Sequence, residues 1–229
     1  MNAIGLIMSI IYFLLLLFLI IVLLKDTDKK HYVKVKMLVS SAFLGMAFYF
    51  SVFGSDYAEL RSFLLAGLIA CWCGDLALGY YHKKKRKPYI LVGVGLFAVA
   101  QAMFLLYLYG VDSDVRTVDI VVPLCAIPTV ILLIHGFNLH MGHARYPVVI
   151  YSVLLTGVAT KAVHMMLDYT TGYAFLTGAA AQLFWFSDYV LLFLYFYHTK
   201  SRIAKPILHA ANLILYYGAV YLYVVSILY

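Results

Sequence analysis

The chain has 229 residues, of which 65% are hydrophobic and only 12% charged, and its mean hydropathy is +0.94. Soluble globular domains carry about 25% charged residues, so this composition excludes a soluble domain and predicts a polytopic membrane protein. The net charge of +7 comes from basic residues in short segments between long apolar runs, a pattern that favours a membrane-orientation signal over nucleic-acid binding.

Eight apolar runs are long enough to cross a bilayer, which requires about 20 mostly apolar residues per helix. The first run is expected to be a retained span, because its lysines follow the apolar residues, whereas the basic residues of a signal peptide precede them. Runs of this length favour helices over the alternating strands of a barrel. The sequence therefore predicts an all-α membrane bundle, a single transmembrane domain over 1–229, with spans at 4–24, 37–53, 62–81, 88–109, 118–135, 147–167, 173–197 and 207–228.

Basic residues gather in the odd-numbered connections between these spans, whereas the even-numbered connections hold only Arg61 and Arg116. Because cytoplasmic loops carry an excess of lysine and arginine, we expect the odd loops to be cytoplasmic and both termini to lie on the opposite side. Lys161 falls inside a predicted span, where it is expected to snorkel or to pair with Asp119 or Asp168. The odd connections hold Lys25, Lys29, Lys30, Lys34, Lys36, Lys83, Lys84, Lys85, Arg86, Lys87, Arg145, Lys200, Arg202 and Lys205.

The third and seventh spans share a motif. The two tryptophans of the chain each stand three residues before an aspartate, Trp72 before Asp75 and Trp185 before Asp188. Both spans end in Tyr-His, and the span that follows each of them opens with Lys-Pro. These matches predict two four-helix halves, 1–110 and 111–229, related by an axis along the membrane normal.

An aspartate inside an apolar span costs at least about 2 to 3 kcal/mol, so Asp75 and Asp188 should face the bundle interior or a wet cavity. Two carboxylates in one pocket can divide the work of hydrolysis, one donating a proton while the other activates water. Each aspartate could instead be a structural hydrogen-bond partner, and the residues do not assign the two roles. The side chains expected around the pair are Gln101, Asn212, Tyr216, His82, Trp72 and Trp185.

Four runs carry a resemblance to a known family: GDLAL in the third span, GVGLFAVAQ in the fourth, FWFSD in the seventh and YYGA in the eighth. From about residue 62 onward the chain resembles the lysoplasmalogenase family, the YhhN-like membrane proteins. The resemblance implies a hydrolase that cleaves the vinyl ether bond of a lysophospholipid to a fatty aldehyde and glycerophospho-ethanolamine or -choline. It also implies that Asp75 and Asp188 are the catalytic pair. We expect no cofactor and no metal.

Three positions depart from the family pattern. Gln101 stands where a histidine is expected, Phe104 where a tyrosine is usual, and Val220 at a glutamine position. Two other functions remain open from the residues alone: a proton-coupled transporter of small molecules or lipids, because duplicated halves with intramembrane acids also describe carriers, and a catalytically silent lipid-binding protein.

Two further groups of residues are not expected to form sites. The histidines of the fifth connection lack a neighbouring Cys, Asp or Glu that would complete a metal site. The cysteines are odd in number and lie in apolar spans, which favours packing over a disulfide framework or a zinc site. These residues are His135, His140 and His143, and Cys71, Cys73 and Cys125.

Overall fold

The computed structural model describes residues 2–25, 31–53, 60–84, 88–197 and 204–229, with the backbone alone for 82–84. Within these ranges the regular structure is entirely helical, and each of the eight long helices is long and apolar enough to cross a membrane. The elements are α1 (Ala3–Lys25), α2 (Tyr32–Phe53), α3 (Arg61–Lys84), α4 (Pro88–Val111), α5 (Thr117–Gly136), the 3₁₀ turn η1 (Gly142–Ala144), α6 (Arg145–Asp168), α7 (Gly172–Phe196) and α8 (Ala204–Ser226).

The prediction of eight spans is confirmed, and the largest shift in a boundary concerns α2. This helix begins at Tyr32, five residues before the predicted start at 37. Lys34 and Lys36, predicted as loop residues, therefore lie on the helix, and the Lys36 side chain is buried. The assignment of Lys36 to the loop was wrong, because an apolar helix can include a lysine when a carboxylate on a neighbouring helix pairs with it.

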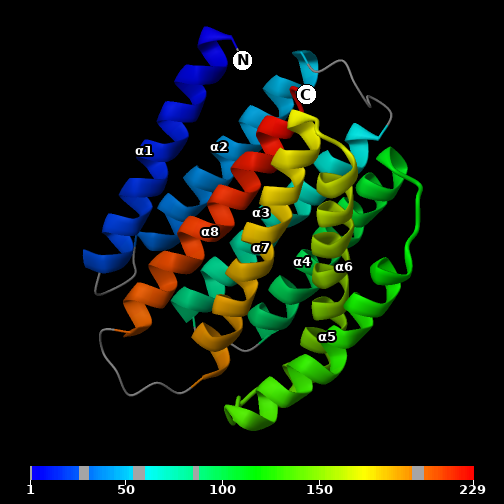
Figure 1. The fold of residues 1–229 in the computed structure, drawn as a ribbon. Coiled ribbons are helices and arrows are strands. Elements are labelled where there is room, and N and C mark those ends of the chain that lie inside the picture. The colour runs from blue at the N-terminus through cyan, green and yellow to red at the C-terminus, as the bar shows by residue number, and fades with distance from the viewer. Residues whose placement is uncertain (1, 26–30, 54–59, 85–87, 198–203) are drawn as a thin grey trace.

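The helices run up and down through the bundle, so that both chain ends lie at the same end of the molecule (Figure 1). We call this the terminal end and the other the opposite end. Most consecutive helices pack against each other, and three further pairs join the first four helices to the last four: α4 with α6, α2 with α8, and α1 with α8. In Figure 1, α8 accordingly lies beside α1, α2 and α7.

Aromatic side chains fill much of the interior. Tyr12 of α1 is fully buried and donates a hydrogen bond of 2.7 Å to the backbone oxygen of Tyr217 in α8. Phe104 of α4 stacks on Tyr223 of α8 with ring centroids 4.6 Å apart, and it approaches α3 at Gly67. These contacts hold α3, α4 and α8 close together around the buried part of α3.

Lys161 on α6 is buried, but its partner is not one of the two that the sequence predicts. Its Nζ lies 2.7 Å from Asp112, just past the end of α4, because α4 packs directly against α6. Asp119 and Asp168 contact His164 instead. Burial raises the pKa of the Asp112 carboxyl, but the hydrogen bonds from Lys161 and from the Asp114 backbone outweigh burial, so this pKa lies below its ordinary value.

Candidate functional site

Asp75 on α3 and Asp188 on α7 line one cavity, in the half of each helix nearer the opposite end. The cavity has a volume of about 20 Å³, which is room for about one water molecule. The two intramembrane acids thus meet at a water-sized space inside the bundle. The other lining residues are Tyr32, Lys36, Leu78, Phe97, Ser187, Leu191, Tyr195, His209, Asn212, Leu213 and Tyr216.

Asp75 is held by a cation and two hydroxyl groups. The Nζ atom of Lys36 on α2 lies 2.8 Å from Oδ1, and both side chains are buried. Ser40 and Tyr216 donate hydrogen bonds of 2.7 and 2.8 Å to Oδ2. The Ser40 hydroxyl is also 2.9 Å from the Tyr217 hydroxyl. A buried cation and two hydroxyl donors thus surround the Asp75 carboxyl group.

Asp188 has different neighbours. The Tyr151 hydroxyl of α6 donates a hydrogen bond to Oδ2 of Asp188, and among the described residues no lysine, arginine or histidine pairs with this carboxyl. Unlike Asp75, its side chain is only partly buried. The two acids therefore differ in charge environment although their sequence motifs match.

The exposed part of Asp188 faces a second pocket of about 50 Å³. The remaining lining residues of this pocket are apolar or aromatic, and Leu78, Phe97, Leu191 and Tyr195 line both spaces. Asp188 thus stands where a polar, water-sized cavity meets an apolar pocket. The residues that line only the apolar pocket are Ile90, Val94, Val148, Tyr151, Leu192 and Phe196.

Asn212 fixes α8 against α7 next to Asp188. Its Nδ2 donates hydrogen bonds of 2.9 and 2.8 Å to the backbone oxygen and the hydroxyl of Ser187, the residue before Asp188. Tyr216, one turn further along α8, reaches Asp75. One face of α8 thereby positions both acids.

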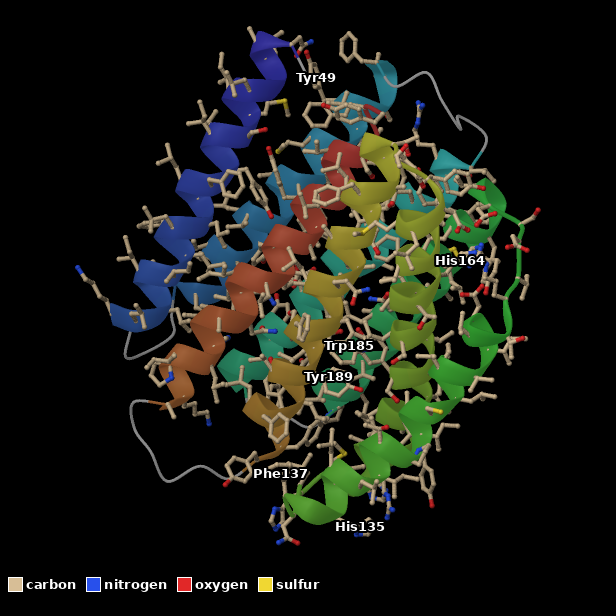
Figure 2. All side chains as sticks on the ribbon, viewed as in Figure 1. Tyr49, His135, Phe137, His164, Trp185 and Tyr189 are labelled. Atoms are coloured by element: carbon tan, nitrogen blue, oxygen red, sulfur yellow. The ribbon has the colours of Figure 1, made fainter. Side chains whose placement is uncertain are left out.

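The tryptophans of the repeated motif do not line the cavity that the acids share. Trp72 donates to the Ser41 hydroxyl on α2 at 3.2 Å, and Trp185 donates to the Thr156 hydroxyl on α6 at 3.3 Å. Figure 2 shows Trp185 on the side of α7 that faces α6. Each tryptophan ties its own helix to the helix before it.

Gln101 and His82 were also expected near the acids. Gln101 is 1% exposed. Its amide lies close enough to the Tyr151 hydroxyl to interact with it, but neither amide atom makes a hydrogen bond of standard geometry to a described residue. Phe97, one turn before Gln101, lines both cavities. The His82 side chain lies outside the described residues.

The sequence did not single out Lys36, Ser40 or Tyr151. Lys36 and Ser40 lie one turn apart on α2 and form a polar stripe, a signal that becomes visible once the helix is started at residue 32. Tyr151 is one of 21 tyrosines, and no spacing distinguishes it from the rest.

Comparison with curated proteins and with solved structures returned no match. The sequence model of the YhhN family matches residues 31–227, which takes in every helix from α2 to α8 and both aspartates. A match over so much of the chain shows the family, and this protein belongs to the YhhN family.

Proposed function

We propose that this protein hydrolyses the vinyl ether bond of lysoplasmalogen-type lysophospholipids to a fatty aldehyde and a glycerophospho-alcohol. The observation that carries the proposal is the shared cavity of about 20 Å³ between Asp75 and Asp188, two carboxyl groups with unlike partners. Family membership agrees with this activity at a coarser level, and the motifs that contain Asp75 and Asp188 resemble those of the lysoplasmalogenases.

The neighbours of the two acids support different roles. Lys36 and two hydroxyl donors contact Asp75, and a carboxyl group paired with a cation suits the role of accepting a proton from water. Asp188 has a neutral hydroxyl as its described partner and lies beside an apolar pocket, which suits a group that carries a proton to the substrate.

The reaction follows from these roles. Asp188 gives its proton to the β-carbon of the vinyl ether, so the double bond becomes an oxocarbenium ion on the ether oxygen. Asp75 takes a proton from the water in the shared cavity as the water oxygen bonds to the carbon next to that oxygen. As the hemiacetal breaks its bond to the glycerol oxygen, Asp75 gives that oxygen the proton it took from water. Asp188 takes the proton of the hemiacetal hydroxyl, which leaves the aldehyde carbonyl, and so regains the proton it gave. One water molecule is consumed, and neither carboxyl group is changed at the end.

The apolar pocket supports the placement of the substrate. Ile90 and Phe196, which line it, lie near the helix ends at the opposite end of the bundle. A fatty chain in this pocket would bring its vinyl ether to Asp188 and leave the phosphate head group near the membrane surface at that end.

Purified protein in detergent is offered lysoplasmenyl-ethanolamine, and aldehyde release is followed for the parent, Asp75→Asn and Asp188→Asn. The parent should release aldehyde, and each variant should lose at least about a hundredfold in rate, the contribution expected of a general acid or base. The 1-alkyl analogue, which has no double bond to protonate, should give no product. Tyr146→Phe, whose side chain is 78% exposed, serves as the control variant.

A folded parent that releases no aldehyde overturns the proposal and moves attention to transport or passive lipid binding. Full activity in Asp75→Asn or Asp188→Asn overturns the assigned chemistry. Elution of each variant as a single species in size exclusion establishes that it has folded.

A further inference from the structure

A second group of charged side chains lies at the terminal end, apart from the two aspartates discussed above. The connection after α4, the first turn of α5 and the last turns of α6 supply it. Four carboxylates face two permanent cations, so the group carries an excess of negative charge even when its histidine is protonated. Its members, here called the terminal cluster, are Asp112, Asp114, Arg116, Asp119, Lys161, His164 and Asp168.

Lys161 and Asp112 of the terminal cluster form an ion pair with each other. Lys161 lies 2.7 Å from the Asp112 carboxylate and donates to the backbone oxygen of Asp114 at 2.6 Å. Its ammonium group also lies 4.8 Å from the centre of the Tyr109 ring. The unbalanced charge therefore falls on the remaining three acids, which share the Arg116 guanidinium and the His164 ring.

His164 is the centre of this remainder. It is 3% exposed and lies on the side of α6 that faces α5 (Figure 2). Its Nδ1 lies 2.9 Å from Oδ2 of Asp119, and because a carboxylate only accepts, Nδ1 carries the hydrogen. Asp119 is itself held in place by the backbone N–H of Arg116 at 3.0 Å. The ring is thus fixed in tautomer and orientation.

The other ring nitrogen has no such bond. Nε2 of His164 is buried and makes no hydrogen bond to any described residue, yet it lies 3.0 Å from Asp168 Oδ2 and 3.5 Å from Asp114 Oδ2. With no hydrogen between them, the lone pair of Nε2 and the two carboxylate oxygens repel one another. A cation in the space between these three atoms would remove the repulsion. This arrangement points to a missing positive charge.

The separations fit a metal ion. One donor atom from each of Asp114, His164 and Asp168 lies within 4.8 Å of the others. Bonds of about 2.0 to 2.2 Å from imidazole and carboxylate to zinc place neighbouring donor atoms about 3 to 3.5 Å apart. A histidine that gives its other N–H to a carboxylate is the usual arrangement of a metal-bound imidazole, the role that Asp119 fills.

We propose that Asp114, His164 and Asp168 bind a divalent transition-metal ion, with Asp119 orienting the histidine. One imidazole and two carboxylates suit Zn²⁺ or Mn²⁺ better than the softer or harder alternatives. The ion supplies the charge that the terminal cluster lacks and joins the connection after α4 to α6. The site stands independently of the proposed hydrolysis, because none of its residues lines the cavity of the two aspartates.

Arg116 is the competitor of the ion. Its guanidinium lies 2.5 Å from Asp168 Oδ2 and 3.3 Å from Asp114 Oδ2, the oxygens that would bind metal. A groove of about 380 Å³, lined by Arg116, His164 and Trp185 among others, reaches the cluster from the side. Arg116 is exposed, so it can turn away from the carboxylates when an ion enters.

The test uses the full chain in detergent, stripped with EDTA and titrated with Zn²⁺ and Mn²⁺ by calorimetry. We expect one bound ion per chain and a rise in the unfolding temperature that EDTA reverses. The visible spectrum of the Co²⁺ form should report nitrogen and oxygen ligands. His164→Gln should abolish binding, and Asp119→Asn should weaken it about ten- to a hundredfold.

Two variants keep the test decisive if His164→Gln does not fold. Asp114→Asn changes a side chain that is 59% exposed and should still lower the affinity at least tenfold. Arg116→Gln removes the competitor and should tighten binding. The control is His143→Gln, an exposed histidine at the opposite end. Absence of a bound ion in the parent, or equal binding in the parent and Asp114→Asn, overturns the site.

Discussion

Lys36 is the counterion of Asp75, and both side chains are buried in the bundle. Removal of one partner from a buried ion pair leaves an uncompensated charge, whereas removal of both charges together is often harmless. The two side chains are only 8% and 1% exposed, so the pair of Lys36 and Asp75 is a buried ion pair.

We predict that Lys36→Met lowers the free energy of unfolding by about 3 to 5 kcal/mol. The double variant Lys36→Met/Asp75→Asn should recover most of that loss, because no lone charge remains. Unfolding in mixed detergent micelles measures both. Lys34→Met, an exposed lysine on the same helix, is the control, and an equal loss in the double variant would contradict the ion pair.

Tyr151 provides the hydroxyl that holds Asp188. Under the proposed chemistry, Tyr151→Phe leaves the ring in place but frees the carboxyl to turn, so kcat should fall on the order of tenfold with little change in KM. Aldehyde release measures both constants. Tyr146→Phe on the same helix should behave as the parent, and a change confined to KM in Tyr151→Phe would argue for a role in binding alone.

At the scale of the helices, length and order could be predicted from the sequence, because a span must cross the apolar core and satisfy its own backbone. The rotation of each helix about its axis could not, because helices that face lipid are apolar on every side. Tyr151 was therefore not distinguished from the other tyrosines, whereas Lys36 was assigned to a loop because the start of α2 was predicted five residues too late. Asp75, Asp188, Asn212 and Tyr216 were accessible to prediction because polar groups in apolar spans stand out.

Gly67 is one of the small residues that allow α3 to pack closely on α4. A Cβ atom at Gly67 would lie 2.3 Å from the ring of Phe104, which is fully buried and stacked on Tyr223. Gly67→Ala should therefore lower stability by about 1 to 3 kcal/mol in thermal unfolding. Gly95→Ala, in α4 with open space around it, should be neutral or stabilising. Equal effects of the two substitutions would contradict the packing.

At the scale of the whole molecule, we propose that residues 1–110 and 111–229 are related repeats. Exchange of the halves turns the contact of α4 with α6 into that of α8 with α2, and both contacts occur. Each motif tryptophan also bonds to the preceding helix, Trp72 to α2 and Trp185 to α6. The halves differ at their acids, since α2 supplies Lys36 to Asp75 and α6 supplies Tyr151 to Asp188.

The orientation of the bundle in the membrane is a separate prediction. We expect the terminal end to face away from the cytoplasm, because the odd-numbered loops carry most of the basic residues. In a chain without cysteine, Tyr229→Cys should react with an impermeant maleimide in intact cells, and His143→Cys should react only after permeabilisation. The reverse labelling pattern would invert the orientation.

The size of the space between Asp75 and Asp188 also selects the nucleophile. A volume of about 20 Å³ admits water but is small for methanol. In buffer containing methanol, the proposed reaction should thus still yield free aldehyde and no mixed acetal. The narrowness of the chamber would then be what separates a hydrolase from a transferase.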